Sequence, residues 1–363
     1  MAQNEFAGLN VFKNENVTAF CSMVMIKHKA LALYSGGLDS ILACRIIMNQ
    51  GIDVKAIQFI TPFFGYEKKG RENDLASDAF AHYGIKLEIL DVSRDYLEMV
   101  KHPQHGYGKN LNPCIDCKIF LISEARKLLD KEGASFLITG EVLGQRPMSQ
   151  RRDAMRMIER ESKTEGILLR PLSAKHLKPT IPEERGWVDR DKLLDFKGRG
   201  RKFQMMLAEQ LGINNYPAPA GGCLLTNPQI SARIRWLFNR CADVGVDDLL
   251  LTKVGRHFAL AEKTLLVVGR FENENKQIEK RRQKGDVLLE LSENPGPVSL
   301  LRGHLTPHIL AIAASITVRY SKARDDKWVT VVWREEGNHL TQEMKVAPIS
   351  DQDLENYRIE NVL

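Results

Sequence analysis

The stretch YSGGLDS, residues 34–40, directly follows a short apolar run at residues 30–33. A pair of glycines between a strand and a helix lets backbone N–H groups turn inward, because no Cβ blocks them. The helix that follows directs the positive end of its dipole at the same point. Ser35 and Ser40 add hydroxyl donors, and Asp39 can cap the helix or help to hold a metal ion. A plain tight turn needs none of this, so the stretch indicates a phosphate-binding loop.

Short apolar runs alternate with amphipathic segments through the first half of the chain. The runs cover residues 30–34, 54–60, 85–92, 135–139 and 167–172, and the amphipathic segments cover 40–50, 71–83 and 120–131. This alternation predicts an α/β fold in which helices cover both faces of a parallel sheet.

The pattern changes from about residue 249 onward. The sequence there predicts a hairpin at 257–271, a charged helix at 274–284, an apolar helix at 307–321 and an alternating strand at 328–335. We therefore expect a smaller α+β domain with its own core. The expected division is an N-terminal extension 1–27, an α/β domain 28–175, a connector 176–244 and a C-terminal domain 245–363, with the domain boundary near Val244.

Composition excludes some classes of protein. The chain has 363 residues, enough for two or three domains, and no apolar stretch long enough to span a membrane. Its N-terminus lacks the basic-then-apolar pattern of a signal peptide, so we expect a cytoplasmic protein with no membrane partner. The net charge of +6 permits a nucleic-acid partner without requiring one. The sequence does not indicate an oligomeric state.

The loop resembles the pyrophosphate loop of the ATP pyrophosphatase superfamily, whose pattern is S-G-G-x-D-S. No Gly-Lys-Ser/Thr follows it, so it is not a Walker loop. The resemblance implies that ATP and Mg²⁺ bind here and that the enzyme adenylates a carbonyl oxygen and releases pyrophosphate. The residues that the resemblance assigns to the phosphates are Ser35, Gly36, Gly37, Leu38, Asp39 and Ser40.

The same resemblance assigns further residues to the nucleotide. It places the adenine near Gln58 and Phe59, on the second apolar run. Ligands of open α/β sheets bind at the carboxyl ends of the strands, so residues at the end of the fourth run close the site. These are Thr139, Gly140 and Glu141, with Gln145, Ser149 and Gln150 near the ribose or the base that is modified.

Three of the six cysteines lie in settings that indicate chemistry. Cys114 and Cys117 form a C-x-x-C after Pro113, which we expect to hold this segment off a helix, and Cys223 follows two glycines in a turn-rich loop. Thiolates at these positions predict a 4Fe-4S cluster with three cysteine ligands and one iron open to sulfide.

Two other interpretations of these cysteines remain open. Cys223 could carry a persulfide, with Cys114 or Cys117 as its resolving partner. A structural Zn²⁺ site completed by a histidine is the third interpretation. The remaining cysteines have no such setting, and Cys44, in an apolar helix, is expected to be a buried small hydrophobic residue. They are Cys21, Cys44 and Cys241.

Three further stretches carry a closer family resemblance. SFLITGEVLGQRPMSQ, residues 135–150, followed by ILLRPLS, residues 167–173, resembles the adenylation domain of tRNA 4-thiouridine synthases, the ThiI family. NPCIDCK, residues 112–118, is similar to tRNA 2-thiouridylases and to cluster-dependent tRNA thiolases. Together the resemblances cover about residues 28–230. Only about 27 residues precede the first expected strand, too few for that family's N-terminal RNA-binding domains, and no rhodanese-like domain follows.

The C-terminal domain offers another means of binding RNA. The stretch VGRHFALAEKTLLVVGRFENEN, residues 254–275, resembles the RNA-binding domain of the NFACT family. Cations on and near it could contact phosphates, although a charged helix face exposed only to solvent is the alternative. They are Arg256, Arg270, Lys276, Lys280, Arg281, Arg282 and Lys284. Two other basic tracts, residues 149–160 and 196–203, could line a path for RNA.

Taken together, these resemblances imply a tRNA sulfurtransferase that uses ATP to replace a uridine oxygen with sulfur. The 135–150 stretch favours 4-thiouridine, and the C-x-x-C stretch favours 2-thiouridine at the wobble base. The sulfur would come from sulfide or from a donor such as a cysteine desulfurase. Two other functions remain open: a small-molecule enzyme like 7-cyano-7-deazaguanine synthase, and a non-catalytic RNA-binding protein.

Overall fold

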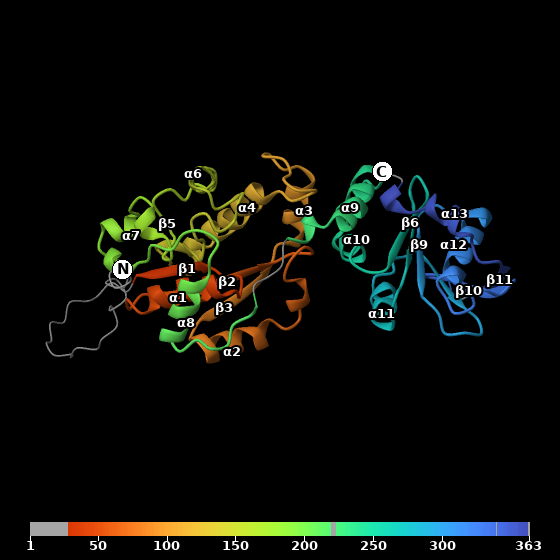
Figure 1. Cartoon of the computed structure of the whole chain (residues 1–363), viewed down its shortest axis with the longest axis horizontal. Coiled ribbons are helices and arrows are strands. Elements are labelled where there is room, and N and C mark those ends of the chain that lie inside the picture. Colours follow the sequence, from red (N-terminus) through yellow and green to blue (C-terminus); the bar gives the residue numbers. More distant parts are fainter. Residues whose placement is uncertain (1–27, 219–222, 339, 362–363) are drawn as a thin grey trace, which may run out of the picture.

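The computed structural model describes residues 28–218, 223–338 and 340–361. Two bodies lie side by side along the long axis of the molecule (Figure 1). The first is built on a five-stranded sheet and the second on a six-stranded sheet. The N-terminal extension, residues 1–27, and Cys21 within it lie outside the described residues.

The first sheet is parallel throughout, with the order β3-β2-β1-β4-β5. Its strands are β1 (Lys29–Leu33), β2 (Asp53–Ile60), β3 (Lys86–Asp91), β4 (Phe136–Thr139) and β5 (Leu168–Leu169). Its helices are α1 (Leu38–Met48), α2 (Glu72–Tyr83), α3 (Ser93–Lys101), α4 (Cys114–Lys127), α5 (Leu129–Glu132) and α6 (Arg152–Glu161). The strand order reverses direction between β1 and β4, which is the position where open α/β sheets bind ligands.

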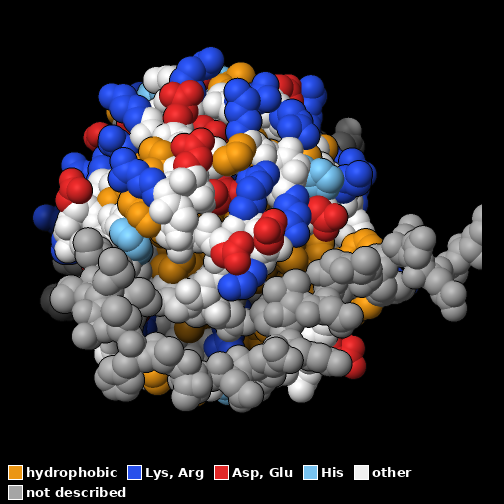
Figure 2. Space-filling view, turned by 90° about the vertical axis from the view of Figure 1, so that its left-hand side faces the viewer, with side chains coloured by type: hydrophobic (Ala, Val, Ile, Leu, Met, Phe, Trp, Pro, Cys, Tyr) orange, Lys and Arg blue, Asp and Glu red, His pale blue; other side chains and the backbone are white. Residues whose placement is uncertain are grey.

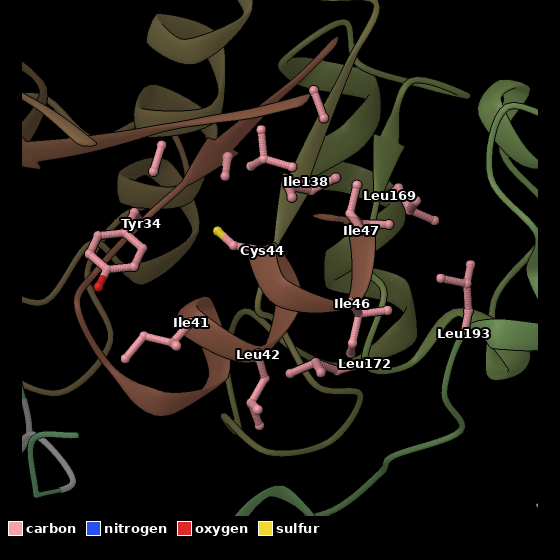
Figure 3. Close-up of a cluster of buried hydrophobic side chains, with 14 of the residues drawn as sticks. Tyr34, Ile41, Leu42, Cys44, Ile46, Ile47, Ile138, Leu169, Leu172 and Leu193 are labelled. Atoms are coloured by element: carbon pink, nitrogen blue, oxygen red, sulfur yellow. The ribbon is translucent and has the colours of Figure 1, made fainter. Parts of the chain in front are cut away.

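Both faces of this sheet are covered. On one face, Ala32 of β1 and Ile138 of β4 pack in one cluster with the apolar side chains of α1, including Ile41 and Ile47 (Figure 3). On the other face, Leu31 of β1 packs in a second cluster with residues of α4 and α6. Successive strand residues point to opposite faces, so an almost wholly apolar strand is buried on both. The expected α/β architecture is confirmed.

The second sheet is antiparallel, with the order β11-β10-β8-β9-β7-β6. Its strands are β6 (Arg256–Ala261), β7 (Thr264–Val268), β8 (Val287–Leu291), β9 (Ser299–Arg302), β10 (Val329–Glu335) and β11 (Thr341–Val346). Its helices are α11 (Glu272–Lys280), α12 (Pro307–Arg319) and α13 (Asp351–Glu355). The expected hairpin, charged helix, apolar helix and alternating strand are all present.

The connector between the two sheets carries short helices. They are α7 (Ile181–Glu184), α8 (Lys202–Gln210), α9 (Pro228–Arg240) and α10 (Val246–Leu251). α8 packs on α1, whereas α9 packs on the C-terminal segment and α10 on α3. Within the described residues, no helix combines the length and the apolar character that crossing a bilayer requires.

One apolar cluster, here called the junction cluster, contains buried side chains of both bodies. Tyr96, Leu97 and Val100 of α3 belong to it, together with Trp236 of α9 and Val267 of β7. In Figure 1, α3 and α9 face each other across the middle of the molecule. A shared core of this kind holds the two bodies together more firmly than a flexible linker would.

One expectation about the cysteine segment was wrong. Pro113 does not keep the C-x-x-C off a helix, because α4 begins at Cys114 with Pro113 as its N-cap residue. Pro113 has a φ of −87° and a ψ of 59°, outside the helical region, and its carbonyl accepts a hydrogen bond from the N–H of Cys117 at 2.8 Å. A proline is well tolerated at a helix start, because no N–H is needed there.

Candidate active site

The loop between β1 and α1 is held by a small network of hydrogen bonds. Ser40 Oγ donates to the carbonyl of Gly37 at 2.7 Å and accepts from the backbone N–H of Ser35 at 3.3 Å. Gln58 Nε2, from β2, donates to the carbonyl of Ser35 at 3.1 Å. Gly36 has a φ of 81°, a conformation that glycine adopts without strain. The loop is therefore fixed in place at the start of α1, as an anion site requires.

A second loop presses against the first one. A Cβ on Gly140 would lie 2.5 Å from both the carbonyl carbon and the carbonyl oxygen of Asp39, so only glycine fits there. From the same segment, Gln145 Nε2 donates to Asp39 Oδ2 at 3.0 Å. The other carboxylate oxygen of Asp39, Oδ1, is buried and has no hydrogen-bond partner among the described residues. This oxygen is the group in the loop that fits a magnesium ion, since Mg²⁺ prefers carboxylate oxygen.

Other residues assigned to the nucleotide contribute to the packing and hydrogen bonding around the loops. Leu38 and Phe59 are buried in apolar clusters on opposite faces of the sheet. Gln150 accepts at Oε1 from the backbone N–H of Arg146 at 2.9 Å, and its neighbour Ser149 is buried. Their placement explains how the loops are shaped, and their assigned contact with a nucleotide stays a prediction.

A buried ionic group lies just beyond these loops. Glu141 is 3% exposed, receives Arg170 Nε at 2.9 Å on Oε2, and has Lys118 Nζ 3.3 Å from Oε1. Thr139 Oγ1 also donates to Glu141 Oε2, at 3.3 Å. Burial favours the neutral form of Glu141, but Lys118 and Arg170 outweigh that effect and lower its pKa to about 2. The carboxylate is therefore charged at any physiological pH.

Lys118 connects this group to the C-x-x-C. It follows Cys117 directly on α4, and burial lowers its pKa while Glu141 and the thiols of Cys117 and Cys114 raise it, with a net increase. One lysine thus bridges the segment after β4 and the cysteine helix. This role of Lys118 was not predicted from the sequence, although the lysine lies within the NPCIDCK stretch.

The three predicted cysteines share one environment around Tyr96. Burial raises the pKa of the Cys117 thiol to about 12, against the opposing effects of a hydrogen bond with Tyr96 and the charge of Lys118. Burial also raises the pKa of Tyr96, and all three thiols add to the increase. Cys223 lies just before a single turn of 3₁₀ helix, Leu224–Thr226, and packs with Cys117 against the junction cluster.

These thiols do not form a finished metal site in the described residues. No group of three or more His, Cys, Asp or Glu side chains there is arranged closely enough to hold a metal ion. The two glycines before Cys223, Gly221 and Gly222, lie outside the described residues. The donor set of three cysteines that influence a common phenol suits a three-thiolate cluster by its chemistry. The cluster itself stays a prediction, as do the persulfide and the zinc alternatives.

Asp116, between the two cysteines, holds the segment before α4 in place. Its carboxylate accepts the backbone N–H groups of Gln104 and His105, at 2.9 Å to Oδ1 and 3.1 Å to Oδ2. It also lies 3.1 Å from His105 Nδ1, while His105 Nε2 lies 3.2 Å from Glu161. Hydrogen bonding to Asp116 raises the pKa of His105. Because both ring nitrogens already have carboxylate partners, His105 is not placed to complete a zinc site.

Many of the cations expected on the RNA-binding face already have partners. Arg270 pairs with Glu274, Lys276 with Glu272 at 2.6 Å and Arg282 with Glu336 at 2.6 Å. Arg256 stacks over the ring of Tyr320, with its guanidinium carbon 4.3 Å from the ring centroid. Lys280 and Lys284 are exposed and have no ion-pair partner in the part of the chain that the structure describes.

The basic tract around α6 is also mixed in charge. Arg151 pairs with Asp153 at 3.0 Å, and Arg160 lies 3.4 Å from Glu161. Figure 2 shows the end of the first body, where Lys and Arg side chains alternate with Asp and Glu. The role of this tract and of residues 196–203 in RNA binding stays a prediction.

Comparison with known proteins now adds to this geometry. Residues 25–179 match the family model described as Thiamine biosynthesis protein (ThiI). This part of the chain is therefore similar to the ThiI family. Residues 255–358 match the model described as NFACT protein RNA binding domain. Both resemblances expected from the sequence are confirmed.

Curated relatives match part of this chain and extend well beyond the matched part. A probable tRNA sulfurtransferase of Thermococcus kodakarensis is 30% identical over 118 residues, which is 32% of this chain and 30% of the relative. One from Bacillus pumilus is 30% identical over 159 residues, 43% of this chain and 38% of the relative. A tRNA-specific 2-thiouridylase of Pelobacter propionicus is 30% identical over 122 residues, 31% of this chain and 33% of the relative. The match thus spans about a third of each relative.

Solved structures resemble the chain only in part. A 4-thiouridine synthetase in complex with RNA and ATP is 23% identical, covers 40% of this chain and 36% of that chain, and has a TM-score of 0.33. A U34-tRNA thiolase from Methanococcus maripaludis with its 4Fe-4S cluster is 21% identical, covers 59% of this chain and 67% of that chain, and has a TM-score of 0.32.

Proposed function

We propose that this protein uses ATP to adenylate a carbonyl oxygen of a tRNA uridine and then replaces that oxygen with sulfur. The observation that carries the proposal is the ion pair between Lys118 and Glu141. It places the cysteine helix beside the segment that closes the phosphate loop, so that nucleotide chemistry and thiol chemistry meet at one edge of the sheet. The second domain supplies the means to hold RNA.

In the first step, the ATP phosphates bind on residues 35–40, where backbone N–H groups and the helix dipole stabilise negative charge. The uridine oxygen attacks the α-phosphorus, an oxygen–phosphorus bond forms, and the bond to pyrophosphate breaks. Asp39 Oδ1 fits the task of holding Mg²⁺ against the departing charge. The uridine oxygen thereby becomes part of a good leaving group, AMP.

In the second step, sulfide forms a bond to the uridine carbon, the carbon–oxygen bond to AMP breaks, and the sulfide proton passes to solvent. No electrons are gained or lost overall. Cys114, Cys117 and Cys223 are the residues that would hold a 4Fe-4S cluster, which would supply an iron site for the sulfide. Lys118, between the thiols and Glu141, places a positive charge where anionic sulfur must be held.

The proposed product is 4-thiouridine in tRNA, with sulfide or a cysteine desulfurase as the source of sulfur. The 135–150 segment supports this choice, because Gly140 lies against the backbone of Asp39 and Ser40 and Gln145 donates to the Asp39 carboxylate. The sequence of a segment beside the nucleotide should depend on which base is modified. The sequence of a segment that handles sulfur should depend on it less.

The proposal is tested with the anaerobically purified chain, an unmodified tRNA transcript, ATP, Mg²⁺ and sulfide. We expect AMP and 4-thiouridine in equal amounts, measured by chromatography and nucleoside mass spectrometry. Asp39→Ala should lower RNA-dependent AMP formation by roughly a hundredfold or more and leave tRNA affinity nearly unchanged. Asp53→Ala is the matched control, because Asp53 pairs with Lys86 at the opposite end of the strands.

The other outcomes are equally informative. Formation of 2-thiouridine would move the modification to the other carbonyl and leave the thiolation chemistry in place. AMP formation with a small molecule and not with tRNA would favour the small-molecule alternative. If Asp39→Ala lost tRNA binding as severely as turnover, the separation of nucleotide and RNA sites would be wrong.

A further inference from the structure

A lysine that no motif singled out lies over the phosphate loop. Lys68 ends a single 3₁₀ turn, Tyr66–Lys68, that follows β2. The turn begins after Gly65, whose φ of 72° suits glycine, and the N–H of Lys68 donates to the carbonyl of Gly65 at 3.0 Å. β2 lies next to β1 in the sheet, so this turn stands at the same carboxyl edge as the loop.

The ammonium group of Lys68 points at the loop backbone. Its Nζ lies 3.7 Å from the position that a Cβ on Gly36 would occupy, closer than any other atom outside the neighbouring residues. Gly36 is the second residue of the S-G-G-x-D-S pattern. A side chain on this glycine would meet the ammonium group, so the space above Gly36 is shared between the loop and Lys68.

Lys68 also lacks a counter-ion. Among the described residues, no carboxylate lies within ion-pair distance of its Nζ, and Glu67 acts on it only at longer range. Burial lowers the pKa of Lys68 below its ordinary value, and Glu67 partly opposes this. A partly desolvated cation without a partner is unfavourable unless an anion binds beside it.

The neighbouring lysine shows the contrast. Lys69 Nζ lies 2.6 Å from Asp91 Oδ2, and half of its side chain is exposed. Its charge is therefore already compensated and directed away from the loop. The two adjacent lysines therefore differ in whether their charge is compensated. Lys69 is paired with Asp91, whereas Lys68 faces the backbone of the phosphate loop.

We propose that Lys68 is a phosphate ligand of the bound nucleotide, holding the terminal phosphates that leave as pyrophosphate. The inference rests on the proposed use of ATP and names a residue for it. The loop supplies N–H donors from one side, and the ammonium group supplies a full positive charge from the other. This charge would stabilise the negative charge that collects on pyrophosphate as the bond to the α-phosphorus breaks.

The test is calorimetric binding of ATP, AMP and pyrophosphate, each with Mg²⁺, to the full chain and to variants. Lys68→Ala should weaken ATP and pyrophosphate binding by roughly tenfold or more, while AMP binding changes by less than about twofold. Lys68→Met keeps the aliphatic stem and should show the same losses. Lys69→Ala, the matched control, should bind all three as the unsubstituted chain does.

Each alternative result counts against the inference in a distinct way. Unchanged ATP affinity in both Lys68 variants would overturn it while leaving the proposed function intact. An equal loss for AMP would overturn the assignment to the terminal phosphates. If the unsubstituted chain bound no ATP at all, the proposed function and this inference would both fall.

Discussion

At the scale of single residues, Gly140 is where the segment after β4 lies against the backbone of the proposed phosphate loop. A Cβ there would lie 2.5 Å from the Asp39 carbonyl and 2.6 Å from the Ser40 nitrogen, and these are backbone atoms that cannot rotate away. Gln145 then fastens the same segment to the Asp39 side chain. The position of the Asp39 carboxylate therefore depends on the absence of a side chain at residue 140.

Gly140→Ala should displace the phosphate loop. We expect ATP affinity to fall by roughly tenfold and the free energy of unfolding to decrease by about 1–3 kcal/mol, because the backbone must shift to relieve the overlap. Calorimetry and chemical denaturation measure the two effects. Gly200→Ala is the control, since a Cβ at Gly200 meets no atom within 4 Å. If the two variants had the same ATP affinity and the same free energy of unfolding, the contact at Gly140 would not determine the position of the phosphate loop.

At the scale of elements, α4 joins the two kinds of chemistry. Its first turn carries Cys114, Asp116, Cys117 and Lys118. Because residues three apart on a helix lie on one side, Cys114 and Cys117 share a face. Asp116 holds the preceding segment through His105, and Lys118 reaches Glu141. The start of one helix therefore positions two thiols, a carboxylate that holds the preceding segment, and a positive charge.

Replacing each cysteine in turn separates the three interpretations of the thiols. We expect Cys114→Ala, Cys117→Ala and Cys223→Ala each to lose most of the iron and the visible absorption of the anaerobically reconstituted protein. Cys44→Ala and Cys241→Ala are the controls, because Cys44 is buried in the apolar cluster around α1 and Cys241 lies at the end of α9. Iron, zinc and sulfide analysis provides the measurement.

The metal content decides the outcome. One zinc per chain with no iron would favour the structural zinc site. Loss of labile sulfur only in Cys223→Ala, with no metal in any variant, would favour the persulfide.

The elements also show what the sequence could predict. The central strands β1 and β4 follow from nearly uninterrupted apolar runs, because both faces of the parallel sheet are buried there. The edge strand β3 mixes apolar and charged residues, and none of its side chains is buried. The contact of Lys118 with Glu141 and Arg170 could not be predicted, because it depends on how α4 crosses the sheet and brings distant segments together. The start of α4 at Cys114 was misjudged, since a proline that ends one element can equally begin another.

The phosphate loop was the most predictable part of the candidate site, because a loop of this kind requires glycines at positions where a side chain would obstruct or strain the backbone. Gly36 and Gly140 both stand where a side chain would collide or strain the chain. Phe59 and Gln58 were assigned together to the adenine, yet they point to opposite sides of β2. Phe59 packs into the core and Gln58 holds the loop. Lys68 escaped notice because nothing near it in sequence marks a site.

At the scale of the whole molecule, the cations predicted to contact RNA differ in how far their charge is compensated. Arg270, Lys276 and Arg282 form ion pairs with glutamates, whereas Lys280 and Lys284 are exposed and have no ion-pair partner among the described residues. A cation that already has a carboxylate partner gains less from a phosphate than a free one does.

Replacing both free lysines should therefore weaken tRNA binding. We expect Lys280→Ala with Lys284→Ala to raise the Kd for tRNA several-fold and to reduce the slope of log Kd against log salt by about 1–2. Lys276→Ala, which removes a paired cation, should have a smaller effect. Binding titrations at several salt concentrations measure both quantities. An unchanged slope in the double variant would place the RNA on another face.

The junction cluster limits how the domains of such a protein can be exchanged with those of its relatives. Domains joined by an exposed linker can be exchanged between relatives, because few contacts cross the boundary. Here Tyr96, which is 1% exposed and lies near the thiols, packs in one core with Trp236 of α9 and Val267 of the second body. A chimera that took its RNA-binding domain from a relative would also replace one wall of the cysteine site. To keep that site, the graft would have to carry a complementary α3 with it.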